Sequence, residues 1–264
     1  MLNHLLTFAI FLLIGIEIRS GVDNAKAAVL PSLAALGGMV LPAAIYLALG
    51  VHREAWAVVM PTDVALAIGA LSLLGSTINP SVRIFLMTLA VADDFFSLAV
   101  IGIFYRRELN LTSAFYTLGA AAIGVLLPGR QQILKVLAPL VTFGIIPIYI
   151  LINLLLKIDL STFTSATSLS VIAARIVGKV LGILLTTWLL TRVTSLSLPP
   201  NLNFKEVVGI GLLSGMGMTV SLVIAGIVIK SQSVFAEIRS GLFLAALISG
   251  VLGLLWLKRF PASL

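Results

Sequence analysis

The chain has 264 residues, of which 60% are hydrophobic and only 10% are charged, whereas soluble domains have about 25% charged residues. It contains no cysteine, which excludes disulfides and thiolate metal sites. The net charge of +7 does not indicate nucleic-acid binding, because the basic residues stand singly or in pairs beside apolar runs, as juxtamembrane charges do. This composition is that of a membrane protein.

Several apolar runs approach the roughly 20 residues that a helix needs to cross a bilayer. Nine runs are expected to span, at residues 1–18, 28–50, 57–76, 82–105, 112–128, 134–156, 165–192, 206–230 and 237–258. Short polar connections separate them, and continuously apolar runs of this length exclude a barrel, whose strands alternate. We therefore expect one all-α transmembrane domain over residues 1–264, with about nine helices.

The orientation of these helices follows from their basic residues. With nine spans, the side that carries Lys258 and Arg259 holds more Lys and Arg than the opposite side. Because basic residues are enriched in cytoplasmic loops, we expect the C-terminus to be cytoplasmic and the N-terminus to lie on the other side.

Two of the predicted spans are interrupted by helix-breaking residues. Pro61 lies early in the third run, and the eighth run contains the glycine-rich stretch 214–219. The segments 62–69 and 219–226 resemble each other, which suggests a weak internal repeat. Paired interruptions of this kind indicate a transporter binding site, where half-helix ends expose partial charges that need compensation. A chance match remains the alternative, since glycine and proline are common in membrane helices.

The fourth run contains two adjacent carboxylates, Asp93 and Asp94. A carboxylate within a membrane segment costs about 2.5–3.5 kcal/mol, which makes such residues candidates for function. Neighbouring helix positions point about 100° apart, so one carboxylate can meet a fixed cation while the other faces a hydrated cavity. Their hard oxygen atoms suit Na⁺, and protons compete for the same atoms. The alternative is a charged pair at a helix end near the interface.

Lys179 lies within the seventh run, between Gly178 and Gly182. Small residues allow another helix to approach closely. A buried ammonium needs a carboxylate, and Asp93 or Asp94 would serve; the alternative is that Lys179 snorkels to the interface. We expect Arg175, one turn earlier, to snorkel.

Two further carboxylates have alternative roles. Asp63 follows the break at Pro61, where it could cap the half-helix that begins there or compensate helix ends that face it. Glu17 ends the first run beside Arg19, and its position favours a plain interfacial charge over a cation funnel.

With these residues in view, the chain resembles the NhaA-type sodium/proton antiporters. Six motifs occur in the family's order and cover most of the chain: Phe11–Glu17, Gly37–Ala43, Pro61–Ala65, Arg83–Asp94, Gly178–Gly182 and Gly215–Ser221. The resemblance implies an inverted-repeat transporter in which two interrupted helices cross.

The resemblance also implies a role for each candidate residue. Asp94 would be the principal Na⁺ and proton site, and Asp93 its partner, paired with Lys179 when Na⁺ is absent. Glu17 would lie at the cytoplasmic mouth. The crossing of the two interrupted helices would be formed by Thr62, Asp63, Gly215, Gly217 and Thr219.

The activity implied is exchange of Na⁺ or Li⁺ for a larger number of protons by alternating access, in a bacterial inner membrane, without a cofactor. The N-terminus would then be periplasmic. A homodimer is implied too, although the hairpin that supports it in the family is not matched. Compared with the family's pattern, we also expect the family's first helix and about two helices near 116–135 to be missing from this chain.

Three other functions are weighed against this one. An inactive or regulatory membrane paralogue would retain the ion site without full exchange activity. A passive channel is disfavoured, because interrupted helices suit alternating access and no residue pattern resembles a selectivity ring. An enzyme is not expected, since the sequence shows no nucleophile–base set and no metal cluster.

Overall fold

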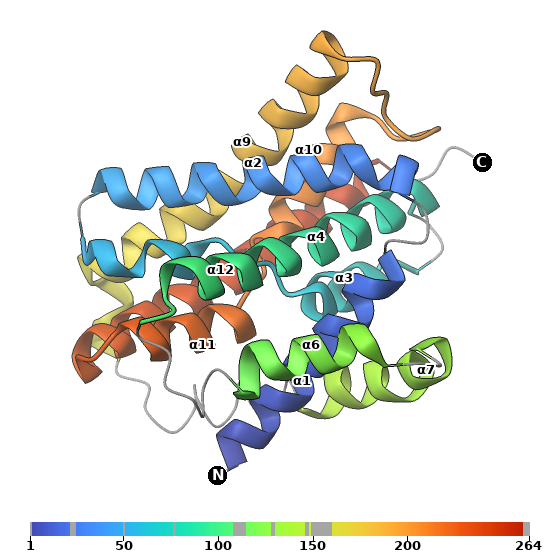
Figure 1. Cartoon of the computed structure of the whole chain (residues 1–264). Helices are drawn as coiled ribbons and strands as arrows, with labels where there is room; N and C mark the ends of the chain where they lie inside the picture. Colours follow the sequence, from blue (N-terminus) through green and yellow to red (C-terminus); the bar gives the residue numbers. More distant parts are fainter. Residues whose placement is uncertain are drawn as a thin grey trace.

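The computed structural model describes residues 2–21, 25–49, 51–75, 78–107, 115–127, 130–145, 148 and 160–260, and these residues form helices without any strand (Figure 1). Four of the helices are long and apolar enough to cross a membrane: α2 (Ala25–Leu49), α4 (Pro80–Phe104), α9 (Ala166–Val193) and α12 (Gln232–Lys258). The expected all-α membrane class is therefore confirmed.

Two further spans are broken, at the places where the sequence predicts interruptions. The first consists of the 3₁₀ helix η2 (Arg53–Val59) and α3 (Val64–Ser72), bent by 41°. The second consists of α10 (Phe204–Ser214) and α11 (Thr219–Val228), bent by 48°. Counting each bent pair as one span gives up to six candidate spans in the described residues, so neither the count of nine helices nor the inverted repeat is confirmed.

Most of the remaining helices pack around the first helix of the chain. Helix α1 (Leu2–Gly21) packs against α6 (Ala120–Leu126) and α7 (Arg130–Leu140), in the lower part of Figure 1. Short π-helical turns precede α6 and follow α7, namely η4 (Phe115–Gly119) and η5 (Val141–Ile145), and the 3₁₀ turn η7 (Leu160–Thr164) leads into α9.

The predicted spans 112–128 and 134–156 differ from the structure. Residues 115–126 form an apolar helix that is too short to pass as a span. The next helix starts at Arg130, before the predicted run, and regular α-helix ends at Leu140, just after Pro139. A π turn at Val141–Ile145 follows it. Most of 146–156 lies outside the described residues.

Polar residues in the connections fix the starts of the long helices. Asn79 caps α4 by accepting a hydrogen bond from the Ser81 amide at 2.9 Å, with Pro80 at the first helical position. Asn203 and Glu206 form a reciprocal capping box at the start of α10. Such caps satisfy amides that have no partner within the helix. By contrast, neither α3 nor α11 receives a side-chain cap from the residue that precedes it.

Helices α2 and α9 cross at close range because glycines face each other. A Cβ atom on Gly182 would overlap the backbone of Gly37, and one on Gly178 would overlap Pro42. This confirms that the glycines around Lys179 admit another helix at short distance. The close approach holds the middle of α9, and with it Lys179, inside the helix bundle.

Candidate functional site

Asp63 caps the helix across the crossing rather than its own. Its Oδ2 accepts hydrogen bonds from the amides of Met218 at 2.6 Å and Thr219 at 2.9 Å, and its Oδ1 accepts one from the Thr219 hydroxyl. The Asp63 amide donates to the Met216 carbonyl at 2.9 Å. Of the two roles open from the sequence, the carboxylate thus takes the second, because it compensates the positive N-terminal end of α11.

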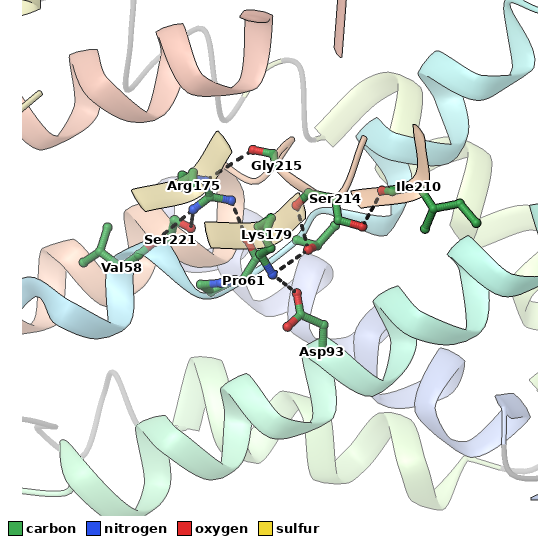
Figure 2. Close-up of polar contacts among 10 residues, drawn as sticks. Val58, Pro61, Asp93, Arg175, Lys179, Ile210, Ser214, Gly215 and Ser221 are labelled. Atoms are coloured by element: carbon green, nitrogen blue, oxygen red, sulfur yellow. Dashed lines mark hydrogen bonds and ion pairs between the residues drawn. The ribbon is translucent and has the colours of Figure 1, made fainter. Parts of the chain in front are cut away.

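Arg175 is fully buried and binds the opposite, carboxyl ends of the broken helices (Figure 2). Its Nε donates to the Gly215 carbonyl at 3.2 Å, and its two terminal nitrogens donate to the carbonyls of Val58 at 3.1 Å and Pro61 at 2.5 Å. The Ser221 hydroxyl accepts a further hydrogen bond at 2.9 Å. The expectation that Arg175 snorkels is wrong, because these interior oxygen atoms satisfy the guanidinium where it lies.

The glycines of the second break are needed for space. A Cβ atom on Gly217 would overlap both the Arg175 guanidinium and the Pro61 carbonyl, and one on Gly215 would overlap the Ser249 side chain. The two breaks therefore approach each other more closely than residues with side chains would allow.

Lys179 lies one turn after Arg175 and joins the crossing to α4. Its Nζ donates to Asp93 Oδ2 at 2.9 Å and to the Thr62 hydroxyl at 2.9 Å, and that hydroxyl donates to the Ser214 carbonyl at 2.8 Å (Figure 2). The side chains of Lys179 and Asp93 are 1% and 0% exposed. Snorkelling of Lys179 is therefore excluded.

The two adjacent aspartates face different surroundings, as their angular separation on α4 predicts. Asp93 meets Lys179, while Asp94 lines a small cavity together with Asp63 and Thr219. Both residues are buried, and α4 continues to Phe104, so they are not a pair at a helix end. The cavity of about 20 Å³ has room for about one water-sized particle.

Glu17 reaches the same cavity from α1 and is partly buried. Its role, as a plain interfacial charge or as part of a cation funnel, stays a prediction. Glu17 brings a further carboxylate to the cavity wall, which is otherwise formed mostly by apolar side chains such as Ile10, Leu13 and Val64.

Three buried oxygen atoms on α4 have no hydrogen-bond partner within the described part of the chain: Asp93 Oδ1, Asp94 Oδ1 and Ser97 Oγ. Buried polar atoms in native proteins are nearly always bonded, so each of these atoms is a candidate ligand. Sequence reasoning missed Ser97, although its position one helical turn after Asp93 could have indicated it. Among the described residues no three His, Cys, Asp or Glu side chains are placed to hold a metal ion together, so a cation here would also need hydroxyl or water oxygens.

The chain matches the family model described as Na⁺/H⁺ antiporter 1 over residues 1–132 and 128–257. It is 30% identical to the Na(+)/H(+) antiporter NhaA of Citrobacter koseri, over 97% of this chain and 82% of the relative. It is 30% identical to Na(+)/H(+) antiporter NhaA 1 of Klebsiella pneumoniae, over 98% and 81% respectively. It is 29% identical to the Na(+)/H(+) antiporter NhaA of Escherichia coli O1:K1, over 97% and 82%.

The alignment to the Citrobacter protein runs over 319 positions, more than the 264 residues of the chain, so this relative contains residues with no counterpart here. The family match divides between residues 128 and 132. The helices expected to be absent near 116–135 fall in that part of the chain, and their absence stays a prediction.

Proposed function

The chain belongs to the Na⁺/H⁺ antiporter 1 family, and from this premise we propose that it is a secondary active antiporter in which Na⁺ and protons compete for Asp94 and Asp93. The observation that carries the proposal is the buried Asp94 carboxylate, which lies beside a cavity and has an oxygen without a hydrogen-bond partner among the described residues. Its neighbour Asp93 is held by Lys179.

Competition at Asp94 provides the coupling between the two ions. A buried carboxylate is costly when ionised and unpaired, so it is stable in this environment with either a proton or a cation bound. One ion therefore displaces the other, and binding of both at once is disfavoured. Hydroxyl and carboxylate oxygens, including Asp93 Oδ1 and Ser97 Oγ, supply the hard ligands that Na⁺ and the smaller Li⁺ prefer.

The ion pair with Lys179 makes Asp93 fully available to Na⁺ only when Lys179 releases it. Asp93 Oδ2 is bound to the ammonium, whereas its Oδ1 has no partner in the described residues. A cation that enters between the two aspartates repels Lys179 and takes over its role at Asp93. The pair then forms again when Na⁺ leaves.

Alternating access would result from movement of the crossing relative to α4. The two broken helices meet near Asp63, and broken helices of this kind surround the substrate in inverted-repeat transporters. Tilting of the crossing would open Asp94 first to one side of the membrane and then to the other. We place the protein in the bacterial inner membrane, with the C-terminus cytoplasmic, the N-terminus periplasmic and Glu17 at the cytoplasmic mouth.

The inactive or regulatory paralogue is not favoured. The family match extends over both halves of the chain, and the named relatives are antiporters rather than enzymes or regulators. A homodimer remains a prediction.

The proposal is tested by ion exchange in everted membrane vesicles that contain the protein. Addition of Na⁺ should collapse a preformed proton gradient in vesicles with the wild-type chain, and Asp94→Asn should abolish the response. Glu54→Gln is the matched control, because Glu54 is exposed. The absence of a Na⁺ response in correctly inserted wild-type protein would overturn the proposal. Na⁺ binding without proton-coupled flux would instead support the paralogue.

A further inference from the structure

We propose that Arg175 is a positioning residue of the antiport site, a permanent charge that holds the carboxyl ends of both broken helices so that Lys179 is free to release Asp93. This inference rests on the proposed function and assigns a division of labour between the two cations on α9. Arg175 would maintain the crossing throughout the cycle, and Lys179 would take part in ion exchange.

The contacts of Arg175 join the two halves of the crossing. Val58 and Pro61 lie at the carboxyl end of η2, and Gly215 follows the last residue of α10. The guanidinium donates to all three carbonyls and also to the Ser221 hydroxyl on α11. One side chain therefore bonds to both broken spans at the ends where their carbonyls lack helical partners and carry negative partial charge.

The surroundings of Arg175 are shaped to hold its guanidinium group. Arg175 has no exposed surface, and Gly217 provides the space that its head group occupies. The planar guanidinium offers five donors in a fixed geometry, whereas an ammonium offers three on a flexible stem. The guanidinium can therefore reach four acceptors spread over three segments of the chain, whereas a lysine would keep the charge and reach fewer of them.

The charges of the cluster divide into two compensated sets and one remainder. Arg175 at the carboxyl ends is balanced by Asp63 at the N-terminal end of α11, and Lys179 is balanced by Asp93. Within the described residues Asp94 has no ion-pair partner, and Glu17 adds a further carboxylate to the same cavity wall. Carboxylates therefore outnumber cations around the cavity, and a proton or Na⁺ at Asp94 would supply positive charge there.

Arginine and lysine differ in the property that this division requires. A guanidinium stays protonated at any pH at which proteins function, whereas a buried ammonium can lose its proton. Thus the ends of the broken helices would keep their compensating charge when the ammonium of Lys179 moves away from Asp93. If Lys179 had to compensate those carbonyls as well, its release from Asp93 would loosen the crossing.

The charged groups near Arg175 are the ones that can contribute to a pH-dependent change at this residue. Asp63 and Asp93 face it from the connection before α3 and from α4, and Lys179 adjoins it on α9. The described parts of α11 and η7 contain no charged residue, and α2 contains Lys26 at its start. The charged residues of the other packed helices, η2, α10 and α12, are Arg53, Glu54, Lys205, Glu206, Glu237, Arg239 and Lys258.

The test uses Arg175→Lys in the full-length protein, with Arg192→Lys as control, because Arg192 is an exposed residue of the same helix. A lysine at 175 keeps a charge near neutral pH and loses it as the pH rises. We expect Na⁺-driven proton flux to stay within about threefold of the wild-type rate near pH 7 and to fall about tenfold relative to it at alkaline pH. A purely structural role predicts the same loss at every pH, which would overturn the proposal, as would an unchanged alkaline profile.

A second measurement does not depend on transport. The thermal unfolding midpoint of purified Arg175→Lys should fall with rising pH more steeply than that of the wild type or of Arg192→Lys. If wild-type vesicles show no Na⁺ response, the proposed function fails, and this unfolding profile still tests the role of Arg175. Equal pH dependence in all three proteins would refute that role even if transport is normal.

Discussion

The helix crossing and the aspartate pair lie side by side, yet they satisfy their polar atoms in opposite ways. At the crossing, both oxygens of the Asp63 carboxylate and the guanidinium of Arg175 are bound to named partners. On α4, Asp93, Asp94 and Ser97 each retain a buried oxygen atom without a partner in the described residues. The crossing is thus a completed scaffold, and the face of α4 has bonding capacity left for an ion that comes and goes.

We expect the largest effect on transport when Asp94 loses its ability to bind an ion. Asp94→Asn eliminates the charge that attracts Na⁺ and the group that binds the proton. Na⁺-driven proton flux should fall by about 100-fold or more, which corresponds to about 3 kcal/mol for a lost charged ligand. The unfolding midpoint should change little, because Asp94 Oδ1 has no hydrogen-bond partner among the described residues. A strongly destabilised variant would show that Asp94 belongs to the scaffold instead.

Damage to the crossing should give the reverse pattern. Asp63→Ala leaves the amides of Met218 and Thr219 buried without an acceptor, at a cost of about 3 kcal/mol of unfolding free energy. Thermal unfolding of the purified protein measures this cost. Asp63→Asn is the matched control, since its amide oxygen can keep one of these bonds and should lose less. Equal stability of Asp63→Ala and the wild type would contradict the scaffold role.

The link between the two regions is tested at Lys179. Lys179→Met leaves Asp93 without its cation, so a buried carboxylate becomes available to protons that compete with Na⁺. The apparent KM for Na⁺ should rise about tenfold at fixed pH, with a smaller change in the maximal rate. Kinetics of proton release at a series of Na⁺ concentrations separate the two quantities. A collapse of the maximal rate alone would place Lys179 with the scaffold.

We expect the smallest effect on transport from removal of the Ser97 hydroxyl on α4. Ser97→Ala removes one neutral oxygen from the face of Asp93 and Asp94. It should raise the apparent KM for Na⁺ about fivefold, because a neutral ligand contributes about 1 kcal/mol. Ser170→Ala on α9 serves as a comparison, because Ser170 is also buried in a long helix. An effect of similar size at both serines would remove Ser97 from the ion site.

Much of the site was predictable because it depends on local geometry. Pro61 and the glycines near 215 predict broken helices, since they remove a donor or a side chain at fixed positions. The adjacent aspartates were expected to face different surroundings, because consecutive helical residues point about 100° apart. The glycines beside Lys179 indicated the close approach of another helix, which is α2.

The remainder depends on contacts between distant segments. Arg175 was expected to snorkel, since its acceptors are backbone carbonyls, and the sequence does not show which carbonyls lose their helical partners. The partner of Asp63 was equally hidden, because α11 follows it by more than 150 residues. For Ser97 the sequence offered only its position one helical turn after Asp93, and small residues are common in membrane helices because they help them to pack. The short helices after 115 could not be separated from spans by hydropathy alone.

The cap that Asp63 places on α11 has a consequence for biosynthesis. The third span leaves the ribosome long before residues 218 and 219, so its carboxylate enters the bilayer without the amides that satisfy it in the finished protein. An unpaired carboxylate at that depth costs about 2.5–3.5 kcal/mol, which favours a position near the membrane surface or water. We therefore expect the break at Pro61 to reach its final arrangement only after α11 has been inserted. This antiporter would complete its centre late, once most of its helices are already in the membrane.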